Sequence, residues 1–326
     1  MGEAAQPLVL VTGANGFVGR ALCQQLVQQG YRVRAAVRTA GLKPAGVAEE
    51  LVMGDICAVT DWSGALRDAE LVVHLAARVH MLRDDRDRSD PYLATNTRAT
   101  QRLADAAARA GIRRLVYLSS IKVNGEQTAA RSYTPFDEPQ PQDAYARSKQ
   151  LAEQYLMGLN AARALSVAIV RPPLVYGPCV RANFLRLLRW VDRGTPLPLA
   201  AVANRRSLVS VWNLCDLLVH LLEHPHASSH PWLVSDGEDL STPQLIRRIA
   251  HAMERRALLL PVPSALLQWS AALLGRKQEI ARLCGSLTVD IGATRRELQW
   301  SPPVSVDDGL ARTVRWYLST EHANGT

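Results

Sequence analysis

One stretch decides the fold of this chain: Val11-Thr12-Gly13-Ala14-Asn15-Gly16-Phe17-Val18-Gly19-Arg20. It follows the apolar run Leu8–Thr12, which is typical of a buried strand, and it opens the helical pattern Phe17–Gln29. In this context three glycines let the backbone turn tightly, approach a pyrophosphate and pack the helix closely against the strand. The unpaired N–H groups at the start of the helix also favour phosphate binding. We therefore predict a dinucleotide-binding loop, with a turn that binds no ligand as the alternative; its predicted contacts are Gly13, Asn15, Gly16, Phe17, Val18 and Gly19.

Beyond this loop, short apolar runs alternate with amphipathic helical patterns. The predicted strands are Leu8–Thr12, Arg32–Val37, Leu51–Met53, Leu71–His74, Leu115–Leu118, Val167–Val170 and Trp232–Ser235, and the helical patterns include Phe17–Gln29, Tyr92–Ala110 and Asp143–Asn160. Strands separated by helices form parallel sheets that are covered on both faces. We predict an α/β protein with a Rossmann-type, doubly wound parallel sheet and a smaller, interleaved C-terminal lobe. The nucleotide-binding domain is expected over residues 1–177, with 211–237 returning to it, and the lobe over 178–210 and 238–326.

The composition limits the kind of protein and its location. Of 326 residues, 48% are hydrophobic and 21% are charged, which excludes a disordered chain. Five cysteines form an odd set without a CxxC pair, so a secreted disulfide framework is not expected. The first residues lack the pattern of a signal peptide, and no apolar run approaches the length of a membrane span. We therefore expect a soluble, cytoplasmic protein.

The chain is basic, with 38 Lys and Arg residues against 30 Asp and Glu residues. Only four of the basic residues are Lys, and the arginines are spread along the whole chain. A nucleic-acid binder is expected to combine clustered positive charge with interleaved aromatic residues, yet aromatic residues make up only 6%. A phosphate-bearing small molecule is therefore the favoured partner, and a nucleic-acid binder is the alternative.

The chemistry is predicted by a second motif, Tyr145-Ala146-Arg147-Ser148-Lys149. It places a phenol and an ammonium group four residues apart, on one face of a helix. An ammonium group near a phenol lowers the tyrosine pKa, because it stabilises the phenolate. Tyr145 is then a usable proton donor or acceptor for a carbinol oxygen. Taken alone, the pair also fits a solvated helix face.

The glycine spacing GxxGxxG, together with the Tyr–Lys pair, resembles the short-chain dehydrogenase/reductase family. The resemblance implies that Ser120, in Leu118-Ser119-Ser120-Ile121-Lys122-Val123-Asn124-Gly125, binds the reacting oxygen, and that Lys149 also holds the nicotinamide ribose. It implies a catalytic set of Ser120, Tyr145, Lys149 and Asn96. Further implied cofactor contacts are Asp55, Ile56, Leu75, Ala76, Ala77, Tyr145, Lys149 and Pro172. A non-catalytic dinucleotide sensor, the remote alternative, would not need this catalytic set.

The end of the second predicted strand bears on the choice of cofactor. About 20 residues beyond the glycines, an NAD enzyme commonly has an acidic residue that binds the ribose 2′-hydroxyl. Here the strand is followed by Arg38, and no acidic residue occurs before Glu49. A guanidinium group forms charge-assisted pairs with a 2′-phosphate, so NADP is favoured and NAD stays an alternative. A solvated surface arginine is the other explanation of Arg38.

The second half of the chain resembles the extended branch of this family, the NAD-dependent epimerases and dehydratases of nucleotide sugars. The resemblance is carried by Val170-Arg171-Pro172-Pro173-Leu174-Val175-Tyr176-Gly177-Pro178 and by Asn204–Leu214. It implies a UDP-sugar substrate, with contacts from Ser119, Ser120, Lys122, Tyr145, Asn183, Arg206 and Arg282. It also implies a homodimer that pairs through Tyr92–Ala110 and Asp143–Asn160. No metal site is predicted, because the histidines at 224, 226 and 230 have no cysteine or acid at ligand spacing.

Two reactions fit these residues. The phrases NRRSLVSVWNL and SDGEDLSTPQL resemble a UDP-glucose 4-epimerase-like subgroup, several members of which reduce UDP-4-keto-6-deoxy-N-acetylhexosamines for lipopolysaccharide O-antigen. A 4-reductase delivers hydride once from NADPH, whereas a 4-epimerase keeps NAD bound, oxidises C4 and returns the hydride. Because Arg38 favours NADPH, we expect the 4-reductase, with a UDP-glucose or UDP-N-acetylglucosamine 4-epimerase as the alternative. A 4,6-dehydratase is disfavoured, since Ile121 and Lys122 follow Ser120 where two acids would be needed.

Overall fold

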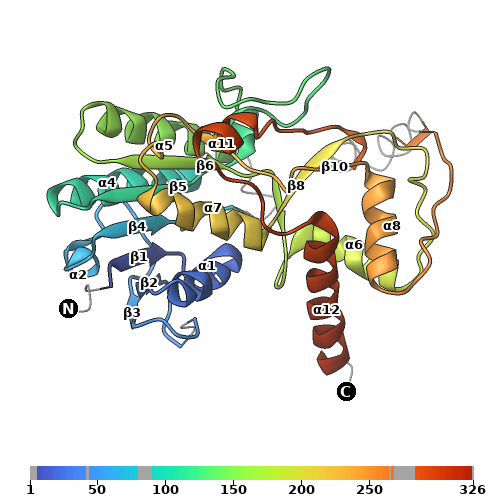
Figure 1. Cartoon of the computed structure of the whole chain (residues 1–326), viewed down its shortest axis with the longest axis horizontal. Helices are drawn as coiled ribbons and strands as arrows, with labels where there is room; N and C mark the ends of the chain where they lie inside the picture. Colours follow the sequence, from blue (N-terminus) through green and yellow to red (C-terminus); the bar gives the residue numbers. More distant parts are fainter. Residues whose placement is uncertain (1–5, 42–43, 80–89, 264–265, 268–282, 325–326) are drawn as a thin grey trace.

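The centre of the fold is a parallel sheet. A computed structural model describes residues 6–41, 44–79, 90–263, 266–267 and 283–324. Within these ranges, seven strands form one sheet in the order β3-β2-β1-β4-β5-β6-β9 (Figure 1). They are β1 (Leu8–Thr12), β2 (Arg32–Val37), β3 (Glu49–Val52), β4 (Leu71–His74), β5 (Arg114–Leu118), β6 (Val167–Arg171) and β9 (Trp232–Leu233). All of their pairings are parallel, which confirms the predicted α/β class.

Helices cover both faces of this sheet. On one face lie α1 (Phe17–Gln28) and α7 (Val211–Glu223), and on the other lie α2 (Ser63–Leu66), α4 (Ala99–Arg109) and α5 (Ala144–Ala161). Neighbouring residues of a strand point to opposite faces, so Leu10 packs with Leu103 while Val11 belongs to the cluster of Leu22. Both Leu10 and Val11 are fully buried. Burial on both faces explains why the strand cores are apolar without alternation.

A second sheet lies beside the first. In the described part of the chain it has three strands in the order β10-β8-β7, which are β7 (Leu174–Tyr176), β8 (Arg206–Ser210) and β10 (Asp239–Leu240). The helices α6 (Ala182–Asp192), α8 (Thr242–Ala252) and α12 (Val306–Asn324) stand at the same end of the molecule (Figure 1). They share a separate apolar core, which includes Tyr176, Leu188, Ile249 and Val314. None of the described helices combines the length and apolar character needed to cross a bilayer.

Several elements differ from the sequence-based expectation, among them β3, which spans Glu49–Val52 where Leu51–Met53 was predicted. The helix predicted over Tyr92–Ala110 is interrupted: α3 (Asp90–Tyr92) leads into a π-helical turn, Leu93–Arg98, before α4 begins. Such turns are frequent at functional sites, and this one contains Asn96. Strand β9 is shorter than predicted, because only Trp232 and Leu233 pair with β6. The described part of the chain also contains a 3₁₀ turn, Ile121–Val123, and α11 (Gly292–Glu297).

Candidate active site

The glycine loop joins β1 to α1 as predicted. Gly13 has φ +67°, and a Cβ added to it would lie 2.9 Å from the backbone nitrogen of Ala76. A Cβ on Gly19 would collide with the carbonyl oxygen of Gly13, and one on Gly16 would lie 3.1 Å from the same oxygen. The cap residue of α1 is Gly16, and no side chain caps the helix. This loop therefore fits a dinucleotide, since it keeps uncapped N–H groups beside a turn in which Gly13 has a positive φ and no side chain fits at Gly19.

Two charged residues lie beyond the ends of neighbouring strands. Arg38 follows β2 and Asp55 follows β3, and their side chains form an ion pair with an Nη1–Oδ1 distance of 3.7 Å. Both side chains are highly exposed, at 73% and 90%. The structure therefore brings together two residues that the sequence assigns to the same cofactor. The guanidinium is open to solvent, as contact with a 2′-phosphate would require.

A buried chain of hydrogen bonds, which sequence reasoning missed, connects the glycine loop to the catalytic region. The Thr12 hydroxyl accepts from the Ala76 N–H at 3.2 Å and lies 2.6 Å from His74 Nδ1. His74 Nε2 lies 2.9 Å from the Thr100 hydroxyl, which donates to the Asn96 carbonyl at 2.8 Å. Because each hydroxyl has one proton, this order assigns the His74 proton to Nε2. The polar residues at the ends of two adjacent buried strands were the signal available in the sequence.

Tyr145 lies in the first turn of α5, next to Ser120. Burial raises the pKa of Tyr145 to about 12, and its hydrogen bond with Ser120 acts in the opposite direction. The expectation that Lys149 lowers the pKa of Tyr145 is therefore wrong for this structure. The physical reason is that burial dominates, while the Lys149 ammonium group serves other partners. Tyr145 is thus a neutral phenol near pH 7, the form that donates a proton.

Lys149 is buried one helical turn after Tyr145. Its Nζ donates to the Leu118 carbonyl at 2.9 Å and lies 4.5 Å from the centre of the Tyr117 ring. Burial lowers the pKa of Lys149 to about 7, and the charge of Glu153 acts against that decrease. An ammonium group that titrates near neutral pH in a closed site suits proton transfer.

Asn96 holds two parts of the site together. Its Oδ1 accepts from the Arg78 N–H at 2.8 Å, and its Nδ2 donates to the Arg78 carbonyl and to the Ser148 hydroxyl, each at 3.0 Å. Ser148 in turn donates to the Tyr145 carbonyl at 2.7 Å. The π-helical turn therefore connects α5 to the segment after β4, which includes the predicted contacts Leu75, Ala76 and Ala77.

The turn after β5 places the other predicted residues of the set. Ser120 caps the 3₁₀ turn, and the Pro172 carbonyl accepts from the Ile121 N–H at 3.0 Å, which brings Pro172 beside it. The Ser119 hydroxyl is buried and has no hydrogen-bond partner in the described part of the chain. The ammonium group of Lys122 contacts two carboxylates. Ile56, also predicted to contact cofactor, packs against the cluster under β1 and β4.

The predicted sugar-nucleotide contacts lie on other elements. Arg206 begins β8, and its Nη1 donates to the Gly285 carbonyl at 3.1 Å. Asn183 is exposed in the first turn of α6. Arg282, predicted to complete a diphosphate clamp, lies outside the described residues.

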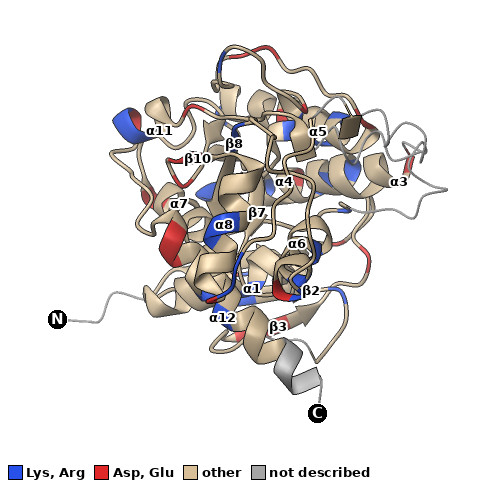
Figure 2. Ribbon diagram, turned by 90° about the vertical axis from the view of Figure 1, so that its right-hand side faces the viewer, with Lys and Arg blue, Asp and Glu red and all other residues tan. Residues whose placement is uncertain are grey.

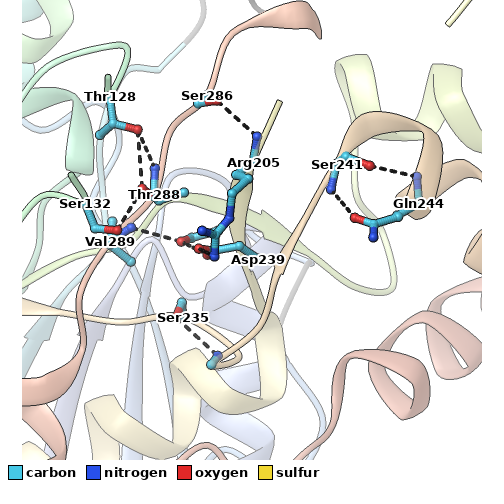
Figure 3. A network of polar contacts seen from close by, with 12 residues as sticks. Thr128, Ser132, Arg205, Ser235, Asp239, Ser241, Gln244, Ser286, Thr288 and Val289 are labelled. Carbon is cyan, nitrogen blue, oxygen red and sulfur yellow. Dashed lines mark hydrogen bonds and ion pairs between the residues drawn. The ribbon is translucent and has the colours of Figure 1, made fainter. Parts of the chain in front are cut away.

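Residues 286–289 lie between β8, which begins at Arg206, and the loop that follows β5 (Figure 3). On one side the Thr128 N–H donates to the Ser286 carbonyl at 2.9 Å. On the other side the Ser207 N–H donates to the Leu287 carbonyl, also at 2.9 Å. The loop after β5 and strand β8 are therefore both hydrogen-bonded to residues 286–287, a connection that no local pattern in the sequence indicates.

Comparison with known proteins agrees with this geometry. The model of the NAD dependent epimerase/dehydratase family matches residues 9–235. A UDP-glucose 4-epimerase of Vibrio cholerae is 40% identical over 322 residues, which are 96% of each chain. The structure of MoeE5 in complex with UDP-glucuronic acid and NAD is 26% identical, has a TM-score of 0.77, and is covered over 99% of its length by 96% of this chain.

A UDP-glucuronic acid 4-epimerase from Bacillus cereus in complex with NAD has the same fold, with a TM-score of 0.77 at 23% identity. The match covers 96% of this chain and 99% of that one. The family model spans the glycine loop, the Ser120 turn and α5, and the 40% identical relative aligns with nearly the whole chain. The chain therefore belongs to the NAD dependent epimerase/dehydratase family of enzymes that act on nucleotide sugars.

Proposed function

We propose that this protein is a UDP-hexose 4-epimerase that retains a nicotinamide dinucleotide in the glycine loop. The observation that carries the proposal is the Ser120, Tyr145 and Lys149 site in a chain that is 40% identical to a UDP-glucose 4-epimerase over 96% of its length. The binding of UDP-glucuronic acid and NAD by MoeE5 supports the same substrate class. The 40% identical relative supports the epimerase alternative better than the 4-reductase expected from the sequence.

Each residue has a defined role in this proposal. Ser120 and Tyr145 hold the C4 oxygen of the sugar, and Tyr145 exchanges a proton with that oxygen. Lys149 holds the nicotinamide ribose. Asn96 holds α5 against the segment after β4 through its hydrogen bonds to Ser148 and Arg78. When bound in the glycine loop, the dinucleotide would supply the acceptor and donor of hydride for C4.

The two parts of the chain divide the binding. We propose that residues 1–177 and 211–237 bind the cofactor, and that 178–210 and 238–326 bind the nucleotide sugar. Arg206 supplies positive charge for the diphosphate. We propose that Asn183 and Arg282 also contact the nucleotide sugar. Support comes from the separate core of α6, α8 and α12 and from the position of Arg206 at the start of β8.

The test is an assay of purified protein with UDP-glucose, UDP-galactose and their N-acetyl forms, without added cofactor. Interconversion of a 4-epimer pair, with dinucleotide released on denaturation, is the expected result. Absence of interconversion for every pair, from protein shown to contain the dinucleotide, would overturn the proposal. Tyr145→Phe protein is the control for contaminating activity.

A second candidate is NADPH-dependent 4-reduction of a UDP-4-keto-6-deoxy-N-acetylhexosamine for O-antigen synthesis. Two observations favour it: Arg38 is exposed at the end of β2, and Tyr145 is neutral, the form that protonates a new alkoxide. Oxidation of NADPH by such a keto sugar, followed at 340 nm, would establish it.

The Arg38→Ala variant tests whether the protein prefers NADPH or NADH. It should weaken NADPH binding about tenfold or more and leave NADH binding unchanged, because a charge-assisted pair is lost. Arg32→Ala, at the other end of β2, is the control. Equal losses for both cofactors would exclude a role for Arg38 in the recognition of the 2′-phosphate.

We also propose a homodimer through the outer faces of α4 and α5. Leu151 of α5 is a large apolar side chain that is 37% exposed, which supports pairing of the outer face of α5 with a second copy. Light scattering should report twice the chain mass, and Leu151→Glu should return it to the monomer value. A wild-type monomer would contradict this proposal.

A further inference from the structure

Lys122 joins two parts of the site that are distant in the sequence. Its Nζ donates to Glu126 Oε1 at 2.8 Å and to Asp143 Oδ2 at 2.6 Å. The Lys122 side chain is 30% exposed, and the two carboxylate side chains are 20% and 37% exposed. One partly buried ammonium group therefore neutralises part of the charge of two carboxylates, under conditions where ion pairs are stronger than at the open surface.

We refer to the Lys122–Asp143 ion pair as the bridge. Each of its two residues contacts a part of the proposed catalytic site. The backbone N–H of Lys122 donates to the Ser120 hydroxyl at 3.3 Å. Lys122 therefore also contacts the hydroxyl that faces Tyr145. Asp143 is the cap of α5, and its Oδ1 accepts from the Ala146 N–H at 2.7 Å. Tyr145 lies within this capped first turn. The Lys122–Asp143 contact thus sets the distance between the Ser120 turn and the start of the catalytic helix.

The bridge also affects the charge around the phenol. Among the described residues, the groups that face Tyr145 are Ser120 from the turn, Tyr92 from α3, Tyr117 from β5 and the Asp143 carboxylate. The charge of Asp143 raises the pKa of Tyr145. Lys122 hydrogen bonds to Asp143 and, although burial acts against it, the pKa of Asp143 is lowered. Loss of the ammonium group would leave the negative charge beside Tyr145 without its counter-ion.

We propose that Lys122 is a positioning residue, which holds the Ser120 turn against the start of α5 and offsets the charge of Asp143 beside Tyr145. It acts through Asp143, and this role replaces the substrate contact expected from the sequence. The part that concerns turnover rests on the proposed function, whereas the part that concerns the bridge does not.

The bridge is tested by amide hydrogen exchange on the full chain. Lys122→Gln should speed exchange about tenfold in both residues 118–126 and residues 143–149, because the contact that joins them is lost. Lys122→Arg, which keeps the charge, should leave both segments near wild type. The matched control is Arg131→Gln, since Arg131 lies in the same loop but pairs with Asp137 at 2.7 Å. Unchanged exchange in both segments of Lys122→Gln would overturn the proposal.

The effect on Tyr145 is tested by the pH dependence of turnover. In Lys122→Gln the pKa that governs proton transfer should rise by about one pH unit, the size expected for loss of a nearby positive charge. KM for the nucleotide sugar should stay unchanged, and Lys122→Arg should restore the profile. A raised KM with an unaltered profile would show a substrate contact and overturn the proposal. If no nucleotide sugar is turned over, the proposed function fails while the exchange experiment still decides the role of Lys122.

Discussion

Tyr145 and Lys149 stand one helical turn apart on α5, yet their polar groups serve different neighbours. The Tyr145 hydroxyl pairs with Ser120, and the Lys149 ammonium group donates to the Leu118 carbonyl. Their protonation states are both set by burial, which raises the pKa of Tyr145 to about 12 and lowers that of Lys149 to about 7. At the scale of the residue, a neutral phenol is thus placed beside an ammonium group that gives up its proton near neutral pH.

Tyr145→Phe removes the proposed proton donor without changing the shape of the side chain. Turnover should fall by about 100-fold or more, which is the usual contribution of a positioned acid or base, while NAD(P) binding is retained. Steady-state assays together with cofactor fluorescence check both parts. Tyr155→Phe is the matched control, since the Tyr155 hydroxyl is on the same helix but donates to Asp105 of α4. Unchanged turnover of the Tyr145 variant would contradict the assignment.

At the scale of the element, the glycine loop owes its shape to close backbone contacts. The carbonyl of Gly13 accepts from the Gly16 N–H at 2.9 Å, and α1 then passes directly over this turn. There is no space for a side chain at Gly19, where an added Cβ would lie 2.8 Å from Ala14 backbone atoms. The loop and the helix therefore form one unit with β1.

Gly19→Ala should destabilise this unit by about 1–3 kcal/mol, the usual cost of overpacking, and should weaken cofactor binding. Gly158→Ala is the control, because a Cβ there meets nothing within 4 Å and α5 should gain about 0.5–1 kcal/mol. Urea denaturation measures both free energies of unfolding. If Gly19→Ala kept the stability and the cofactor affinity of the wild type, the close packing of Gly19 against Gly13 and Ala14 would be excluded.

A buried ion pair fixes α5 to β6 behind the site. Arg171 Nη2 and Glu153 Oε2 are 2.5 Å apart, and the two side chains are only 4% and 2% exposed. Glu153→Gln should lower the free energy of unfolding by about 3–5 kcal/mol, because it leaves a buried guanidinium without its counter-ion. Glu223→Gln breaks the half-exposed pair with Arg113 and should cost less than about 1 kcal/mol. Similar losses for the two variants, measured by chemical denaturation, would contradict this difference.

At the scale of the whole molecule, a buried polar network connects the two sheets to the C-terminal segment. Asp236 accepts from the Tyr176 hydroxyl at 2.8 Å and from Asn213 Nδ2 at 2.6 Å. Asn213 also donates to the Val304 carbonyl and accepts from the Val304 N–H, each at 2.8 Å. An amide is required at 213, since a carboxylate would face both Asp236 and a carbonyl.

The distribution of charge also belongs to this scale. In Figure 2 the basic segments are spread over several elements, including α8 and α11, with acidic segments between them. Many described arginines have carboxylate partners, such as Arg248 with Glu238 and Asp307. The scattered pattern supports the sequence-based preference for a small phosphate-bearing ligand over nucleic acid.

The stability of the whole fold should depend on pH through His74. Burial, with a smaller effect from Lys149, lowers the pKa of His74 from 6.5 to about 3. The unfolded chain therefore binds a proton below about pH 6.5, while the folded chain binds it only near pH 3. The free energy of unfolding should fall as the pH decreases through this window, by up to about 1.4 kcal/mol per pH unit.

Denaturation curves between pH 6.5 and pH 4 measure this slope. His74→Gln removes the titrating group, so its slope should be smaller than that of the wild type, although its stability at pH 7 should be lower because the Thr12 and Thr100 contacts are disturbed. Equal slopes in the two proteins would show that His74 is not the group responsible.

The sequence alone determined the sheet, the glycine loop and the Tyr145–Lys149 spacing, because each depends on residues that are close in the chain and on a simple period. It also indicated Arg38 as a charge at the end of β2. Only the tertiary structure decided the protonation of Tyr145, the direction of Lys149 and the bridge made by Lys122. The physical reason is that these properties depend on burial and on partners from other elements, as when Lys122 reaches an aspartate 21 residues away. Local patterns encode which elements form; packing determines what each functional side chain meets.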